Sequence, residues 1–218
     1  MNHHYSLKPG VFYHVYNRGI NGENIFKEER NYAYFLNKYA IYLNPVIETY
    51  AYCLLKNHFH LLVRVKTDLT CNPDQTGNPH LTGFRNLSGM ENERGLHHTD
   101  NIVSKKFSDL FNSYTKSINK AYNRTGGLFE TPFRRIEVTS ETYFTRLIWY
   151  IHFNPQKHGF INDFREYPHS SYNSFLAHKK TNLEKEEVLN WFGSEKDYLN
   201  FHETKPFETE FSSFIIDP

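Results

Sequence analysis

Two strand-like segments separated by two residues constrain the fold of this chain more than any other feature. Residues 47–55 (IETYAYCLL) are rich in strand-forming side chains, and residues 58–65 (HFHLLVRV) follow a two-residue alternation. Only Lys56 and Asn57 lie between them, and so short a connection predicts an antiparallel hairpin. The fold must therefore contain a sheet.

The segments around the hairpin complete an α+β pattern. In chain order we expect a strand over 11–17, a helix over 28–43, the hairpin, a helix over 105–124, a strand over 133–138 and a helix over 140–154. Ser140 is the expected N-cap of the last helix, which should end or kink at Asn154 because Pro155 follows. This order predicts a small antiparallel sheet with helices packed on it, the ferredoxin-like arrangement.

The chain is expected to divide into a core and two additional segments. Residues 1–66 and 105–160 form the predicted core. Residues 67–104 are polar and lack a sustained hydrophobic period, which predicts a long insertion loop. Residues 161–218 are expected to be a C-terminal appendage, with a short helix near 184–192 and an acidic, loose end.

Composition restricts the protein classes and the cellular location that we expect. The two cysteines, Cys53 and Cys71, exclude a disulfide scaffold and an all-cysteine zinc site. No apolar run approaches the roughly 18 residues needed to span a bilayer. The N-terminal residues lack the apolar core of a secretory signal. We therefore expect a cytoplasmic protein without a membrane partner.

The net charge of +1 conceals an uneven distribution. Residues 181–218 contain three lysines against nine acidic residues, so the preceding 180 residues carry 22 basic and 15 acidic side chains. A basic body fits a polyanionic partner, although an uneven solvated surface would give the same totals.

Two histidines in the second strand of the hairpin form a candidate metal site. His58 and His60 are two residues apart and therefore share one face of the strand, while Phe59 points to the other. Side chains spaced about 6–7 Å along a strand can bind one cation. Two partly buried histidines on an aromatic-rich sheet are the alternative interpretation.

The helix over 140–154 carries a second candidate group. Phe144, Leu147, Ile148 and Ile151 form its predicted buried stripe. Tyr143, Tyr150 and Asn154 lie along one edge of this stripe, between the sheet and solvent. Tyr150 and Asn154 are one turn apart, and the helix end should free the Asn154 amide. The alternative is that both are ordinary surface residues.

These two groups occur in the motifs NHFHLLV and YIHFNPQKHG, in that order. Together they resemble the single-tyrosine HUH transposases of simple insertion sequences and their REP-associated relatives. The resemblance covers about residues 8–175 and includes YHVYNRG, LFETPFRR and YPHSSY. The fold of that family is the ferredoxin-like sheet already expected from the hydrophobic pattern.

The resemblance implies a chemistry for each residue. His58 and His60 match paired metal ligands, Asn154 matches the residue that completes the metal site, and Tyr150 matches the nucleophile. It also implies Mg²⁺ or Mn²⁺ as cofactor, a 5′-phosphotyrosine intermediate, and single-stranded DNA with a hairpin as substrate. The expected protein is a bacterial nickase and strand transferase, acting as a monomer or a homodimer.

Basic residues near this site are expected to bind the DNA backbone. They come from the YHVYNRG segment, the polar face of helix 105–124 and the PFRR segment: Arg18, Lys116, Lys120, Arg124, Arg134 and Arg135. Aromatic side chains could stack on unpaired bases.

Three other functions remain open from the sequence. The first is a domesticated protein that binds DNA hairpins without cleaving them. The second is another HUH nickase, a replication initiator or relaxase. A zinc hydrolase ranks last, because no third histidine, cysteine or carboxylate is obviously placed.

Overall fold

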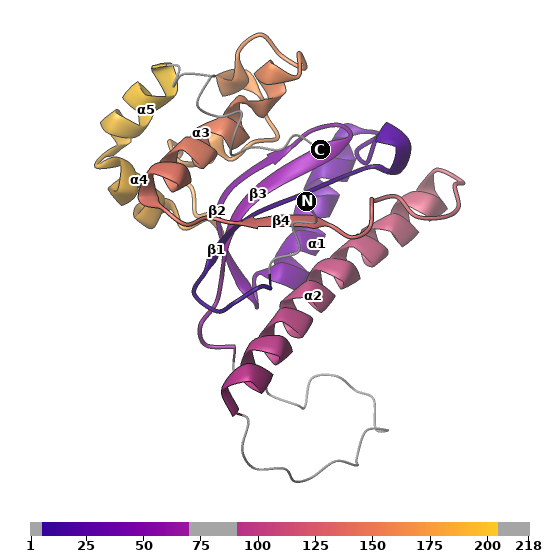
Figure 1. Cartoon of the computed structure of the whole chain (residues 1–218). Helices are drawn as coiled ribbons and strands as arrows, with labels where there is room; N and C mark the ends of the chain where they lie inside the picture. The colour runs from indigo at the N-terminus through magenta and orange to yellow at the C-terminus, as the bar shows by residue number, and fades with distance from the viewer. Residues whose placement is uncertain (1–5, 70–90, 205–218) are drawn as a thin grey trace.

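A four-stranded antiparallel sheet lies at the centre of the computed structural model (Figure 1). Its strands are β1 (Phe12–Arg18), β2 (Ile47–Leu54), β3 (His58–Val65) and β4 (Arg134–Glu137), in the spatial order β2-β3-β1-β4. The structure describes residues 6–69 and 91–204, with backbone only for 91–99 and 101. The predicted α+β, ferredoxin-like sheet and its hairpin are confirmed.

Helices cover both faces of the sheet (Figure 1). On one face lie α1 (Glu29–Leu43) and α2 (Glu91–Ala121); on the other lie α3 (Glu141–Lys157), α4 (Lys185–Phe192) and α5 (Glu195–Glu203). Short 3-10 helices span Ile20–Gly22, Phe164–Glu166 and Tyr172–Ser174. No helix in the described ranges has the length and apolar character to cross a membrane.

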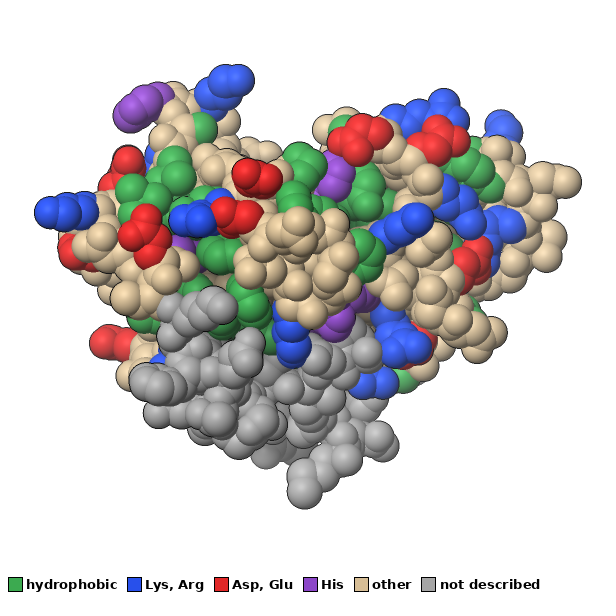
Figure 2. Space-filling model, turned by 90° about the horizontal axis from the view of Figure 1, so that it is seen from above, with side chains coloured by type: hydrophobic (Ala, Val, Ile, Leu, Met, Phe, Trp, Pro, Cys, Tyr) green, Lys and Arg blue, Asp and Glu red, His purple; other side chains and the backbone are tan. Residues whose placement is uncertain are grey.

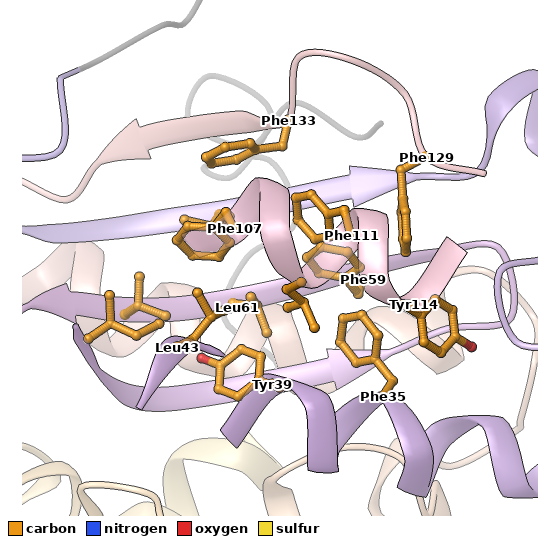
Figure 3. Packing of buried hydrophobic residues seen from close by; sticks show 14 of the residues in the cluster. Phe35, Tyr39, Leu43, Phe59, Leu61, Phe107, Phe111, Tyr114, Phe129 and Phe133 are labelled. Carbon is orange, nitrogen blue, oxygen red and sulfur yellow. The ribbon is translucent and has the colours of Figure 1, made fainter. Parts of the chain in front are cut away.

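The face beneath α1 and α2 is packed with apolar and aromatic side chains (Figure 3). The alternation of β3 directs Phe59, Leu61 and Val63 into this layer. Phe59 lies within 5.6 Å of the Phe35 ring of α1 and 5.8 Å of the Phe111 ring of α2, between centroids. The same strand therefore directs its other side chains, including both histidines, toward α3.

Helix α2 corrects one prediction, because it begins at Glu91 and not at 105. The loop predicted over 67–104 is therefore wrong for residues 91–104, while 70–90 lie outside the described residues. Tertiary contacts outweigh the polar composition: Val103 is fully buried in the apolar layer, and the Asp100 carboxylate accepts a hydrogen bond from Leu7 N at 3.1 Å.

The described part of the C-terminal segment is more integrated than an appendage. Residues after 160 supply Phe175, Val188 and Tyr198 to the core on the α3 face, all with 0% exposure. Helix α4 matches the predicted helix near 184–192, whereas α5 was not predicted. Ser194 caps α5 through a hydrogen bond that its side chain accepts from Asp197 N.

Helix α3 also differs from expectation, because it continues through Pro155 to Lys157. His158 N donates to Asn154 O at 3.0 Å and thereby closes the helix end. Every residue from Leu147 to Pro155 is buried, so packing on several sides holds the helix together where proline removes one backbone hydrogen bond. The predicted end at Asn154 is wrong. The predicted cap is confirmed, since Ser140 Oγ accepts from Tyr143 N.

Candidate functional site

Neighbouring strands bring two histidines together beneath α3. Tyr16 is the register partner of His60 across β1 and β3, so His14 lies on the adjacent diagonal. His14 Nε2 is 2.9 Å from His60 Nδ1, and both residues have 0% exposure. This hydrogen bond joins two imidazoles inside the protein.

His58 lies beside His60 on the same face, as the alternation predicted. Their ring centroids are 5.3 Å apart and the rings are nearly perpendicular, at 88°. His58 Nδ1 is 2.8 Å from Asn57 Oδ1. A carbonyl oxygen only accepts, so the ring carries its proton on Nδ1 and, when neutral, its lone pair on Nε2.

The Tyr150 ring of α3 packs against this histidine group. Its centroid is 5.7 Å from that of His60, at 82°, and 6.4 Å from that of His14. Lys157 Nζ lies 5.0 Å from the centre of the Tyr150 ring. Tyr150 is only 2% exposed, so its expected position at an edge facing solvent is wrong. The tyrosine lies inside the layer between helix and sheet.

Asn154 is fully buried one turn beyond Tyr150. Its side-chain nitrogen donates to Tyr150 O at 2.8 Å, so the amide is not freed in the predicted way. Within the described residues, however, Asn154 Oδ1 has no hydrogen-bond partner, and neither does His60 Nε2. Leaving a buried polar atom unsatisfied costs about 1–3 kcal/mol.

The donor types fit a hard or borderline divalent cation. Imidazole nitrogen and amide oxygen are both neutral ligands, and the two unsatisfied atoms come from β3 and α3. Across the described ranges, no cluster of three or more His, Cys, Asp or Glu side chains could hold a metal. A site with His58 and His60 would thus depend on the amide of Asn154 for its third protein ligand.

Electrostatics keep His60 in the form that a metal requires. Burial lowers the pKa of His60 well below its usual value, and the nearby His14, His58, His158 and Lys157 add to this effect. The ring is therefore neutral near pH 7, and a neutral imidazole offers a lone pair.

Three residues of this group were not predicted from the sequence. These are His14, Lys157 and His158, whose ring centroid is 4.9 Å from that of His58. The alternation of β1 contained a signal for His14, because residues 12, 14 and 16 share one face. No local feature of the sequence indicated which face of β1 packs against α3.

The predicted DNA-binding residues fall into two sets. Lys116 and Lys120 are exposed on α2. Arg18 and Arg134 are partly exposed, and both lie near Glu130: Arg18 Nε is 3.0 Å from Glu130 Oε1, and an Arg134 guanidinium nitrogen is 3.8 Å from Oε2. These four side chains remain accessible to a phosphate.

Arg124 and Arg135 are mostly buried and hold parts of the fold together. Arg124 pairs with Glu23 at 2.6 Å, and its side chain is 16% exposed. Arg135 donates to Ser104 Oγ and Asp100 Oδ1 at 3.0 and 3.3 Å, and burial lowers its pKa. Basic and acidic side chains are intermixed on the face drawn in Figure 2.

Two other tyrosines lie on or beside the helices of the sheet, Tyr143 on α3 and Tyr122 just after α2. The Tyr122 hydroxyl donates to Asn31 Oδ1 at 3.1 Å, and its ring packs with the α1 and α2 layer on the opposite face of the sheet. Tyr143 is half-buried in the first turn of α3, seven residues before Tyr150. Tyr150 is the tyrosine of α3 that contacts His60.

A solved structure shares this fold. The structure of a REP-associated tyrosine transposase bound to a REP hairpin superposes with a TM-score of 0.55 over 82% of this chain and 86% of that one. The sequences are 13% identical, so the likeness is one of fold. No family model matches the sequence, and no curated protein matches it either.

Proposed function

We propose that this protein is a metal-dependent endonuclease and strand transferase for single-stranded DNA at hairpin-flanked sites. The observation that carries the proposal is the packing of Tyr150 against His60, together with the oxygen of Asn154, one turn further along α3, which has no partner among the described residues. The transposase of similar fold, which is bound to a REP hairpin, supports the choice of substrate. The sequence motifs around these residues agree with it.

Tyr150 is the proposed nucleophile. Its phenolic oxygen attacks a DNA phosphorus and forms a phosphotyrosine ester, while the bond from phosphorus to the leaving 3′ oxygen breaks. That oxygen takes up one proton, which balances the proton that the Tyr150 phenol gives up, and becomes a free 3′-OH. Attack by a 3′-OH on the ester reverses the step, so strands are rejoined without ATP.

His58, His60 and Asn154 are the proposed ligands of Mg²⁺ or Mn²⁺. When bound, the cation would neutralise charge on a non-bridging phosphate oxygen and polarise the phosphorus. Because all three ligands are neutral, they add no negative charge near the phosphate. The low pKa of His60 keeps its ring ready to bind.

Lys157 is proposed to help Tyr150 lose its proton. A free tyrosine has a pKa near 10, so at neutral pH the phenolate must be stabilised by a nearby positive charge. The ammonium group 5.0 Å from the Tyr150 ring centre can provide that charge. Exposed Lys116 and Lys120, with Arg18 and Arg134, are the proposed phosphate contacts.

The test uses hairpin DNA with a single-stranded flank, labelled at either end, with Mg²⁺ or with EDTA. Wild type should release a fragment with a free 3′-OH and retain the other fragment in a denaturant-resistant complex. Tyr150→Phe should do neither, because no other atom can form that ester. Tyr143→Phe is the matched control and should behave as wild type. Cleavage by Tyr150→Phe would contradict the proposal.

A second candidate is a hairpin-binding protein that does not cleave. The 2% exposure of Tyr150 favours it, since a nucleophile must be reached by its substrate. The same assay separates the candidates, because this protein would bind the hairpin but form no covalent complex in Mg²⁺ or Mn²⁺.

A further inference from the structure

The hydrogen bond between His14 and His60 contains one proton, which is bonded either to His60 Nδ1 or to His14 Nε2. If His60 Nδ1 is protonated, it donates to His14 Nε2, and the lone pair of His60 lies on Nε2. If His14 Nε2 is protonated, it donates to His60 Nδ1, and His60 Nε2 carries a hydrogen instead. Only the first arrangement allows His60 Nε2 to bind a cation.

We infer that His14 is a positioning residue that accepts this hydrogen bond and thereby holds His60 in its metal-binding tautomer. The inference rests on the proposed function, because the tautomer of His60 affects activity only if His60 binds a metal. In this role His14 is not itself a metal ligand and acts through its hydrogen bond to His60.

The surroundings of His60 Nε2 favour this arrangement. Among the described residues this nitrogen has no hydrogen-bond partner, and His60 has 0% exposure. A bare lone pair at that position is available to a cation. The proposed site therefore requires the shared proton on His60 Nδ1, and neutral His14 then carries its own hydrogen on Nδ1.

The tautomer of His58 is fixed by a similar hydrogen bond, to a partner atom that can only accept. Its Nδ1 lies 2.8 Å from Asn57 Oδ1, which can only accept, so His58 also directs a lone pair from Nε2. Both candidate ligands therefore use Nδ1 for an interaction within the protein and Nε2 for the metal. An acceptor behind each metal-bound histidine commonly fixes its tautomer and orientation.

The strands fix the geometry of the pair. His14 and His60 lie diagonally across the β1–β3 ladder, with ring centroids 5.1 Å apart and an angle of 20° between the rings. Neither ring can turn away without disturbing a fully buried layer. A rigid acceptor of this kind holds the ligand in place before the metal arrives.

The direct test is nuclear magnetic resonance of the metal-free protein with 15N-labelled histidine. Correlations over two bonds distinguish a protonated from an unprotonated ring nitrogen, and His60→Gln identifies the His60 signals among the 13 histidines. We expect a protonated Nδ1 and a bare Nε2 at pH 7.5. A hydrogen on His60 Nε2 would overturn the inference.

The second measurement is Mn²⁺ affinity by electron paramagnetic resonance titration. His14→Leu removes the acceptor and should weaken binding by about 10–100-fold, the usual effect of losing such a partner. His14→Gln retains an oxygen that can accept, so its affinity should remain near that of wild type. Equal affinity in wild type and His14→Leu would contradict the inference, and circular dichroism checks the fold of each variant.

The outcomes separate this inference from the proposed function. A wild type with a protonated His60 Nδ1 but no affinity for Mn²⁺ would sink the metal site and leave the tautomer assignment intact. A wild type that binds Mn²⁺ while His60 carries its hydrogen on Nε2 would sink the role of His14 alone.

Discussion

The two faces of the sheet bury their side chains in different ways. Beneath α1 and α2 the layer is apolar, and its buried hydroxyls have partners: Tyr114 donates to Ile25 O at 2.8 Å, and Tyr39 pairs with Thr49 at 2.7 Å. Beneath α3 the layer includes fully buried His14, His60, His152 and Asn154. Over the described part of the chain, the side-chain oxygen of Asn154 and Nε2 of His60 have no hydrogen-bond partner.

This difference distinguishes residues that stabilise the fold from residues whose burial has a free-energy cost. Apolar burial stabilises a domain, whereas a buried polar atom without a partner destabilises it. The other face shows that the same strands pack with apolar residues, so apolar packing alone does not account for the polar group under α3. Such local violations of folding rules are typical of functional sites.

The largest expected effect comes from removing an imidazole on the α3 face. His58→Ala or His60→Ala should abolish Mg²⁺-dependent cleavage, because each opens the proposed cation site. Hairpin affinity should be largely retained, since it depends on distributed phosphate contacts. Cleavage and gel-shift assays on the same DNA measure both. Normal cleavage by either variant would mean that the histidines on the α3 face are not required for catalysis, so that the two faces of the sheet would not differ in function.

On the opposite face, the next largest effect is a loss of stability. Phe59→Ala should reduce the free energy of unfolding by about 3–5 kcal/mol, because it leaves a cavity among fully buried rings. Urea denaturation followed by circular dichroism measures this change. A loss below about 1 kcal/mol would mean that neighbouring side chains fill the cavity left by Phe59, and that this layer is less tightly packed than the structure indicates.

Acid should weaken the attachment of α5 to α3. His152 Nδ1 is 2.9 Å from His202 Nε2, and burial lowers the pKa of His202 to about 4. The unfolded chain, with a histidine pKa of about 6.5, binds more protons between these values. Stability from this group is therefore complete above pH 6.5 and is lost as the pH falls toward 4, by on the order of 3 kcal/mol.

Denaturation midpoints measured from pH 7.5 to 4.5 test this expectation. His202→Leu is the control, because it removes the titrating group and should flatten the pH dependence of stability. An unchanged pH dependence in His202→Leu would show that other groups cause the acid sensitivity.

The smallest expected effect is on the exposed side of α2. Lys116→Ala with Lys120→Ala should weaken hairpin binding modestly and flatten its salt dependence. Each lost phosphate contact lowers the slope of log K against log[salt] by about 0.7–0.9. Lys105→Ala, which removes an exposed lysine already paired with Asp109 at 2.9 Å, is the control. An unchanged slope in the double variant would make both lysines ordinary solvated residues.

The sequence was most informative where the pattern was local. Alternation in 58–65 correctly separated the histidines from the apolar side of β3, and the two-residue connection correctly predicted the hairpin. Helix periodicity correctly placed Phe144, Leu147, Ile148 and Ile151 in the core, although every other residue from 147 to 155 is buried too. Each of these features depends on side-chain direction within one element.

The features that the sequence did not reveal depend on contacts between distant segments. Residues 91–104 are helical although polar, because Val103 and Asp100 are held by the rest of the domain. The pairing of His14 with His60 spans 46 positions and depends on strand order. Burial of Tyr150 depends on its packing against His14 and His60, which come from two different strands.

The most direct test of the central claim is to identify the residue that carries DNA. The covalent complex formed by wild type in Mg²⁺ would be digested with protease and nuclease, and the modified peptide sequenced by mass spectrometry. We predict a single nucleotide-bearing peptide from α3, with the added phosphate on Tyr150. A phosphate on Tyr143, Tyr122 or any other residue would contradict the assignment of the α3 face as the site of cleavage.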